Sequence, residues 1–295
     1  MDKHDGVTMD RRAGAYVEGG AVATLTADDA RKAAALIKTG RVYSLAVQTN
    51  PESPAWPGRS FQVLTDHIWV NGEKEYGSNK LAGIDDYISL WCGVATHLDG
   101  FGHISIDGKH YGDFDTDEVI RSRGAVKHGI ETVPPVATRG VLLDVAATRG
   151  VQALEPGYEI TVEDIDATLR RQNVTIEPGN VVLINTGTIT DITFKEPFDE
   201  AEPGIGSAAA RYLVEELGAV AIGTDNWACE VIPAPDPEAF LPVHGYLIRE
   251  RGVHIIENVW TRDLAADSVY EFMFVMAAPK LVGAVQSPIH PIAIS

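Results

Sequence analysis

Short apolar runs rich in β-branched residues constrain the fold of this chain more than any other feature. Four of them have polar or glycine ends, as expected of buried strands, and lie at residues 140–145, 180–184, 219–223 and 253–256. Helix-type segments separate them. Residues 161–171 begin with a Thr-Val-Glu-Asp capping box, and residues 207–217 have apolar positions at helical spacing. The alternation predicts an α/β fold built on a mixed sheet.

The flanking segments extend this pattern. A Thr-Ala-Asp-Asp capping box at residues 26–29 predicts a helix through 30–38, and a strand is expected at 42–47. Residues 50–60, NPESPAWPGRS, predict an irregular loop of a length that often borders a binding site. A further strand is expected at 270–277. The strands therefore continue almost to the C-terminus.

The domain organisation is expected to be simple. No repeat, low-complexity tract or linker interrupts the 295 residues, and 45% of them are hydrophobic, which is enough for a sizeable core. We predict a loosely structured N-terminal extension over residues 1–20 and a single domain over residues 21–295.

Charge and hydropathy exclude several classes of partner. A formal net charge of −18 makes the average surface repel nucleic acid and anionic lipid, although a bound cation could still draw a small anionic or carbonyl substrate into a pocket. No stretch approaches the ~18 to 20 apolar residues of a membrane span, and the N-terminus lacks a signal-peptide core, so the expected location is the cytoplasm. Cys92 and Cys229 lie outside any CxxC pair, which argues against a disulfide framework or a zinc finger.

The run THLDGFGH at residues 96–103 places three ligand-type side chains, His97, Asp99 and His103, close together. Imidazole with carboxylate suits zinc, manganese or iron better than calcium or magnesium. His97 and Asp99 are two apart, so both leave the same face of an extended strand, and the two glycines that follow free the backbone to return His103 to that point. The run predicts a metal site, with an ordinary surface loop as the alternative.

A second group of polar residues lies in PVHGYLIRERGVHIIEN, residues 242–258. This segment predicts a helix with His244 near its beginning, a stop at Gly252, and a short strand that ends at Glu257. The end of an apolar strand is where open α/β sheets commonly place ligand groups. The alternative is that His244 packs on its helix and Glu257 pairs with a surface cation.

The chain resembles the cyclase family, which includes bacterial kynurenine formamidases and isatin hydrolases, in three places. The first is THLDGFGH, followed by GKHYGD, which is similar to the family metal motif HxGTHxDxPxH. The second is PVHGYLIRERGVHIIEN, in which a histidine on a helix precedes a glutamate after a strand, and the third is the ending GAVQSPIHPIAI. The resemblance extends from about residue 26 to the C-terminus and implies the swivelling β/β/α fold of that family.

The resemblance also implies a set of roles. His97 and Asp99 would bind one divalent metal, zinc or manganese, and Asp99 could bridge to a second ion held by His103 and Glu257. His244 would match the catalytic histidine. With one ion per subunit instead of two, His103 would orient water. A homodimer or homotetramer is implied as well.

Three positions depart from the family motif. Gly93 stands where the first histidine of HxGTH is expected, so one ligand is absent; Ala95 replaces the motif glycine and Phe101 its proline. His110 is the nearest candidate replacement for the missing ligand, with a polar loop histidine as the favoured alternative.

The activity implied is a metal-dependent amidohydrolase reaction on a carbon–nitrogen bond other than a peptide bond, in an aryl formamide, small cyclic amide, imide or lactam. Phe101, inside the ligand run, and Trp227, after an apolar strand, are the candidate walls of a pocket for a flat ring. Asp225 is the candidate carboxylate that holds a ligand histidine by its other nitrogen, and Glu230 is a weaker one.

Other functions stay open to different degrees. A non-catalytic metal or small-ligand binding protein on the same fold is the main alternative, because Gly93 removes a ligand, and a cyclase or dehydratase using the same site is another. A Ser-His-Asp hydrolase is disfavoured because G-x-S-x-G is absent, and a dinucleotide oxidoreductase because no G-x-G-x-x-G follows the strand at 42–47.

Overall fold

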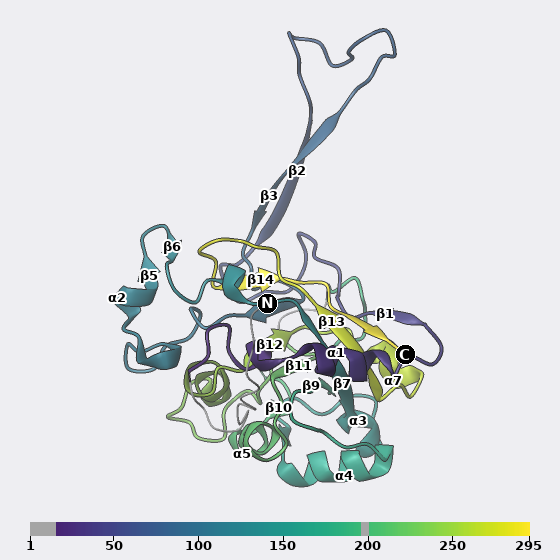
Figure 1. The fold of residues 1–295 in the computed structure, drawn as a ribbon, viewed down its shortest axis with the longest axis vertical. Coiled ribbons are helices and arrows are strands. Elements are labelled where there is room, and N and C mark those ends of the chain that lie inside the picture. Colours follow the sequence, from purple (N-terminus) through teal and green to yellow (C-terminus); the bar gives the residue numbers. More distant parts are fainter. Residues whose placement is uncertain (1–15, 196–200) are drawn as a thin grey trace, which may run out of the picture.

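The centre of the molecule is a mixed β-sheet (Figure 1), seen in a computed structural model that describes residues 16–195 and 201–295. Its strands are β1 (Val42–Ser44), β4 (His97–Asp99), β7 (Val136–Asp144), β9 (Val181–Asn185), β11 (Ala221–Thr224), β12 (His254–Glu257), β13 (Glu271–Met276), β14 (Gln286–Pro288) and β15 (Ile292–Ile294). Their order across the sheet is β1-β15-β13-β7-β9-β11-β12-β4-β14. The neighbours β7, β9, β11 and β12 are parallel, and the other pairs are antiparallel.

The central strands are buried on both faces. In β9, Val181 and Leu183 belong to one hydrophobic core, whereas Val182 and Ile184 belong to the other. Side chains alternate between the two faces of a strand, so a strand covered on both sides must be apolar at every position. This explains why the sequence shows unbroken apolar runs rather than alternating ones.

Helical segments cover the sheet. The α-helices are α1 (Ala27–Ala34), α2 (Thr116–Val119), α3 (Val145–Thr148), α4 (Val162–Gln172), α5 (Ser207–Arg211), α6 (Pro242–His244) and α7 (Arg262–Ala266). Short 3-10 turns are η1 (Ala21–Thr24), η2 (Tyr111–Asp113) and η3 (Ile130–Thr132), and η4 (Tyr212–Glu216) and η5 (Gly245–Glu250) are π-helical.

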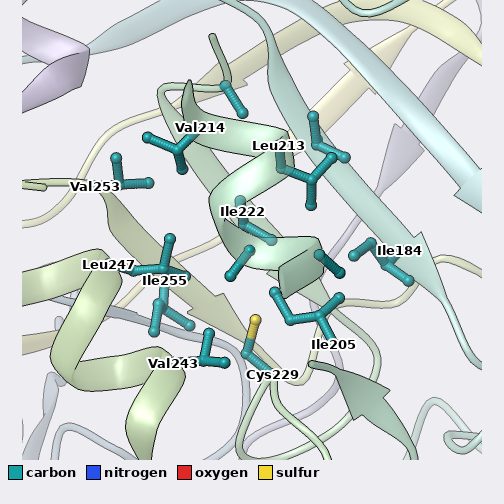
Figure 2. Packing of buried hydrophobic residues seen from close by; sticks show 14 of the residues in the cluster. Ile184, Ile205, Leu213, Val214, Ile222, Cys229, Val243, Leu247, Val253 and Ile255 are labelled. Carbon is teal, nitrogen blue, oxygen red and sulfur yellow. The ribbon is translucent and has the colours of Figure 1, made fainter. Parts of the chain in front are cut away.

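The two cores lie between these helices and the sheet. Figure 2 shows Leu213 of η4 and Leu247 of η5 beside Ile222 of β11 and Ile255 of β12. Leu264 of α7 packs into the other core. The helix that continues from α6 is thus held against the sheet by its apolar side, and this fixes where its first residues lie.

A long arm extends away from the body (Figure 1). It is the antiparallel pair β2 (Phe61–His67) and β3 (Ile84–Leu90), in register from Phe61 opposite Leu90 to His67 opposite Ile84. Its large apolar side chains are exposed, among them Val63, Leu64, Trp69, Ile84, Tyr87 and Ile88. Two smaller pairs are β5 (Ile120–Arg121) with β6 (Gly124–Ala125), and β8 (Glu159–Ile160) with β10 (Gly204–Ile205).

The predicted mixed α/β fold is confirmed, with changes at some boundaries. The capping box of Thr26 and Asp29 is present, but α1 ends at Ala34 rather than at residue 38. Beyond the helix, the backbone N–H groups of Thr39 and Gly40 donate to the carbonyl oxygen of Ser295. The strand predicted over 42–47 is shorter: β1 spans Val42–Ser44 and is the edge strand, paired in the sheet with β15.

The ends of the predicted domain are described only in part. Residues 1–15 of the predicted extension lie outside the described residues. Nearer the body, the Val17 N–H donates to the Tyr111 hydroxyl at 3.0 Å, and the Ala21 N–H donates to the Gly252 carbonyl at 2.8 Å. Among the described residues, no helix has the length and apolar character needed to cross a membrane.

Candidate metal centre

Strand register brings together ligand-type side chains that are far apart in the sequence. His97 and Asp99 lie on the same face of β4, while Leu98 between them points into the core. In the neighbouring strand β12, Glu257 lies directly opposite His97. On the other side of β4, Gln286 of β14 lies opposite Asp99. Residues paired in this way share a face, so the four polar side chains converge.

His97, Asp99 and Glu257 form a buried group whose ligand atoms all lie within 4.8 Å of one another. His97 Nε2 lies 3.0 Å from Glu257 Oε2 and 3.5 Å from Asp99 Oδ1. His97 Nδ1 is 2.8 Å from the Ala95 carbonyl oxygen, which can only accept, so Nδ1 carries the proton and Nε2 offers its lone pair. His97 Nε2 and Asp99 Oδ2 are buried without a hydrogen-bond partner.

Buried electron-pair donors without partners are costly unless a cation binds them. The group therefore fits a divalent metal ion. Its donors are one imidazole and two carboxylates, a set that suits zinc or manganese. Of the four predicted ligands, His97, Asp99 and Glu257 lie in this group and His103 does not, and their binding of a metal stays a prediction.

The pKa values of Asp99 and His97 are shifted by the charged groups that lie close to them. Burial alone would raise the pKa of Asp99, but the surrounding histidines, His103 foremost, hold it well below its usual range. Burial alone would lower the pKa of His97, but the Glu257 and Asp99 carboxylates raise it above its usual value. Asp99 is therefore ionised at neutral pH, and a proton on His97 competes with a cation for Nε2.

His244 lies at the beginning of the helix that starts with α6, as the sequence predicted. Glu230 holds it in place. The carboxylate of Glu230 accepts hydrogen bonds from the backbone N–H groups of Val243 at 3.0 Å and His244 at 2.8 Å, and Oε1 is 2.7 Å from His244 Nδ1. His244 Nε2 then points toward the metal group, 3.1 Å from Glu257 Oε1 and 3.6 Å from Asp99 Oδ2.

Burial would lower the pKa of His244, but these three carboxylates raise it well above its usual value. The carboxylates therefore favour the protonated imidazole, and a bound cation that offsets the charge of Asp99 and Glu257 would make Nε2 available to accept a proton. Because Nδ1 is engaged with Glu230, Nε2 is the only nitrogen of His244 that can exchange a proton with a molecule in the site.

A cavity of about 260 Å³ opens beside the metal group. His103, His244 and Glu257 line it, together with Trp227. The His103 N–H donates to the Gly100 carbonyl at 3.0 Å, which is the tight turn expected of the two glycines. Burial lowers the pKa of His103, so its imidazole is neutral at pH 7. His103 thus faces the same cavity as His244, beside the group that contains His97.

Two of the predicted residues have other roles. Phe101, predicted as a pocket wall, is 2% exposed and stacks on the His254 ring at 4.2 Å in the core, because its ring fills the space beside Gly20, which has no side chain. Asp225, predicted to hold a ligand histidine, instead accepts hydrogen bonds from Thr186 and Gly187, at 2.7 and 2.8 Å from their N–H groups, and so closes the turn after β9.

His110 does not replace the histidine absent at Gly93. Its Nδ1 is 3.1 Å from the Phe101 carbonyl oxygen and its Nε2 is 3.3 Å from the Thr116 hydroxyl, so both ring nitrogens are used by the loop that contains them. The alternative reading of His110 as a polar loop histidine is the one that its contacts support.

Two residues at the site did not stand out in the sequence. Gln286 donates from Nε2 to Asp99 Oδ1 at 2.7 Å, and Arg59 reaches the cavity from the predicted irregular loop. Gln286 reaches the site because β14 pairs with β4 in this register, and no local sequence pattern predicts that pairing. Glu230, the weaker of two candidates in the sequence, is the carboxylate that contacts a site histidine.

Comparisons with known proteins agree with this architecture. The sequence matches the family described as "Putative cyclase" over residues 43–231, and the chain belongs to this family. It is similar to the crystal structure of a novel cyclase, with 28% identity and a TM-score of 0.79, over 97% of this chain and 95% of that chain. A search of curated proteins finds no match.

Two isatin hydrolases share the fold. One, bound to the product analogue thioisatinate, is 18% identical with a TM-score of 0.62, over 92% of this chain and 99% of that chain. The other, isatin hydrolase A from Labrenzia aggregata bound to benzyl benzoate, is 18% identical with a TM-score of 0.61, over 86% of this chain and 93% of that chain. The resemblance to the cyclase family is confirmed, and so is the expected fold class.

Proposed function

We propose that this protein is a metal-dependent hydrolase that cleaves a carbon–nitrogen bond in a small cyclic or aromatic molecule. The substrate classes are an amide, lactam, cyclic imide or aryl formamide. The observation that carries the proposal is the buried group of His97, Asp99 and Glu257, which opens on a cavity lined by His244, whose Nε2 lies 3.1 Å from Glu257 Oε1.

His97, Asp99 and Glu257 would hold one zinc or manganese ion, and His103 would complete the ligand set from the cavity side. A second ion would need His103 and a further donor. When bound, such an ion polarises a carbonyl group and lowers the pKa of water toward neutrality.

The protein's own residues supply the proton transfers. Glu230 keeps the Nδ1 proton of His244 in place, so Nε2 accepts a proton from the attacking water and then donates it to the departing nitrogen. His103, neutral in its buried position, orients that water by accepting a hydrogen bond from it if it is not a ligand. Asp99 is itself oriented by the Gln286 amide.

The cavity suits a flat ring. The Trp227 and Trp56 rings lie with their centroids 5.3 Å apart at 56°, and both line the cavity with Phe240. Aromatic walls favour stacking of planar groups. The fold neighbours described as isatin hydrolases make a bicyclic lactam a sensible first substrate to assay.

The test combines metal analysis with turnover. Purified protein would be loaded with zinc or manganese and assayed on a lactam, a cyclic imide and an aryl formamide, before and after removal of the metal. We expect metal-dependent hydrolysis of at least one, and a loss of roughly 100-fold or more in kcat for His244→Ala with metal content unchanged. Tight metal binding without turnover of any of them would favour the non-catalytic binding protein instead.

A cyclase or dehydratase reaction in the same cavity is distinguished by the products. Hydrolysis in isotopically labelled water puts solvent oxygen into the product, whereas dehydration does not. Label in the acid product would support the proposal, and an unlabelled product would replace it with a dehydration reaction.

We further propose that the protein is a cytoplasmic homodimer or homotetramer in which the arm of β2 and β3 packs against a second copy. The arm exposes large apolar side chains along both strands, with Leu64 and Tyr87 each 65% exposed, and it points away from its own body (Figure 1). A two-stranded hairpin is only marginally stable by itself, and a large exposed apolar surface marks an interaction site.

A further inference from the structure

The base of the arm places a guanidinium group in the candidate active-site cavity. Arg59 precedes β2, and its Nη1 donates to the Gly93 carbonyl oxygen at 3.2 Å, just beyond the end of β3. The Trp91 N–H donates to the Ser60 carbonyl at 3.1 Å and closes the base. Arg59 also lines the cavity that contains His103 and His244.

Gly93 is what admits this guanidinium. A Cβ atom at position 93 would lie 2.4 Å from Arg59 Nη1, 2.9 Å from Gln286 Nε2 and 3.0 Å from Gln286 Oε1. These are contacts that a real side chain does not make, and the atoms in the way are the ends of flexible side chains. Any side chain at position 93 would therefore displace Arg59 and Gln286 rather than prevent the chain from folding.

Gln286 connects Arg59 to the metal group. Its amide approaches the same point beside Gly93 as the guanidinium does, and its Nε2 donates to Asp99 Oδ1 at 2.7 Å. A molecule in the cavity that contacts Arg59 is thus held at a fixed position relative to Asp99. This is the geometry needed to orient a substrate whose reactive carbonyl faces the metal group.

The charge of Arg59 is not balanced by a carboxylate of residues 16–195 and 201–295, none of which forms an ion pair with it. A guanidinium group has five N–H donors in a planar arrangement that matches a carboxylate. The carboxylates of Asp99, Glu230 and Glu257 lie near the same cavity, so a dianion such as a phosphate monoester would meet more repulsion than a single carboxylate.

We infer that Arg59 is a specificity-determining residue that binds a carboxylate group on the substrate, and that Gly93 is the residue that makes room for it. The inference rests on the proposed function and deepens it: the substrate is a monoanionic, carboxylate-bearing cyclic or aromatic amide. The carboxylate lies against Arg59 and the aromatic ring against the wall that Trp56 and Trp227 form together, and the amide carbonyl then faces the metal group.

The test measures binding first, so that it does not depend on turnover. Benzoate and benzamide have the same shape and differ in charge, and Trp56 and Trp227 in the cavity provide a fluorescence signal on the metal-loaded protein. We expect wild type to bind benzoate on the order of 10- to 100-fold more tightly than benzamide. Arg59→Met and Gly93→Ala should remove this preference, whereas Arg59→Lys should retain part of it.

Arg123→Met is the matched control, because Arg123 is an exposed arginine outside the cavity and its loss should leave the preference unchanged. Melting temperatures show that each variant is folded. Equal affinity of wild type for the two probes would overturn the inference, as would a preference that survives in Arg59→Met, since the benzoate would then be bound elsewhere, for example by the metal.

Turnover separates this inference from the proposed function. With 2-formamidobenzoate and formanilide as a matched pair, Arg59→Met should raise KM for the charged amide only. If both amides are hydrolysed and Arg59→Met changes their KM values equally, the hydrolase function is supported and the role of Arg59 is contradicted. If benzoate is preferred through Arg59 but no amide is hydrolysed, the carboxylate-binding role of Arg59 is supported and the proposed hydrolase function is contradicted.

Discussion

Gln286 lies directly opposite Asp99 on the neighbouring strands β14 and β4, and its side-chain amide donates a hydrogen bond to the Asp99 carboxylate at 2.7 Å. The bond uses Asp99 Oδ1 and leaves Oδ2 buried without a partner. A side chain from the last strands of the chain thus determines which oxygen of Asp99 remains available to a cation. The same amide approaches the point beside Gly93 that Arg59 approaches, so the proposed metal site and the proposed carboxylate site share one residue.

Removal of Glu257 should abolish tight metal binding. Glu257→Gln keeps the shape of the side chain but takes away one of the two charges in the group, so we expect the affinity for zinc or manganese to fall by about 100-fold or more. Metal content after dialysis and competition with a chelator measure this. Glu238→Gln, in an exposed loop, is the control and should bind like wild type.

Metal affinity should depend on pH in a defined direction. The pKa of His97 is raised above its usual value of 6.5, so a proton occupies Nε2 at pH values where an ordinary histidine is already neutral. Affinity should increase as the pH rises from about 5.5 to 8, by up to tenfold per pH unit for each proton displaced. Asp99, whose pKa is lowered, remains ionised throughout. Isothermal titration in several buffers would measure the protons released, and an affinity independent of pH would contradict the role of His97.

Glu230 should control the proton affinity of His244 without holding the metal. In Glu230→Gln the charge beside Nδ1 is lost, so the pKa of His244 falls and the acidic limb of the pH–rate profile moves to lower pH. We expect kcat to fall roughly 10- to 100-fold, as for other groups that orient a reacting histidine, with metal content unchanged. A lower metal content, or a profile that does not move, would assign Glu230 a purely structural role.

The core beneath His244 should determine whether the site forms at all. Leu247 is fully buried between η5 and the sheet (Figure 2), so Leu247→Ala should lower the free energy of unfolding by about 2–5 kcal/mol. Denaturant unfolding measures this. Leu281→Ala, at a position 40% exposed, should change it by less than about 0.5 kcal/mol.

The arm should mediate association of copies. Leu64 and Tyr87 lie opposite each other on β2 and β3 and share one face. If that face packs on a second copy, the double variant Leu64→Ser, Tyr87→Ser should shift the protein toward the monomer in light scattering. Val126→Ser, which removes an exposed apolar side chain elsewhere, should not. A wild-type monomer at all concentrations tested would rule the interface out.

The sequence predicts the centre of the fold better than its edges. The runs that became β7, β9, β11 and β12 are buried on both faces, so burial leaves a continuous apolar signal. The arm strands β2 and β3 are exposed and carry no such signal, and β14 and β15 are three residues long in a proline-rich tail. Their pairing depends on distant segments, which local pattern does not encode.

Some residues of the site could likewise be predicted from the sequence and others could not. His97, Asp99 and His103 lie within one short run, and His244 and Glu257 lie in one helix–strand unit, so spacing is enough to suggest them. Phe101 was wrongly predicted as a pocket wall because its neighbours in sequence are ligands, whereas its neighbours in space are His254 and Tyr111. Gln286 and Arg59 reach the site through strand register and the base of the arm.

The ligand group depends on the register of the three-residue strand β4. Side chains alternate along a strand, so a slip of β4 by one residue against β12 would turn Leu98 toward the cavity and bury His97 and Asp99 in the core. Only the correct pairing creates the ligand group. A cation that binds only this ligand group would therefore stabilise the native register of β4 against β12, two segments about 160 positions apart in the sequence, relative to slipped registers.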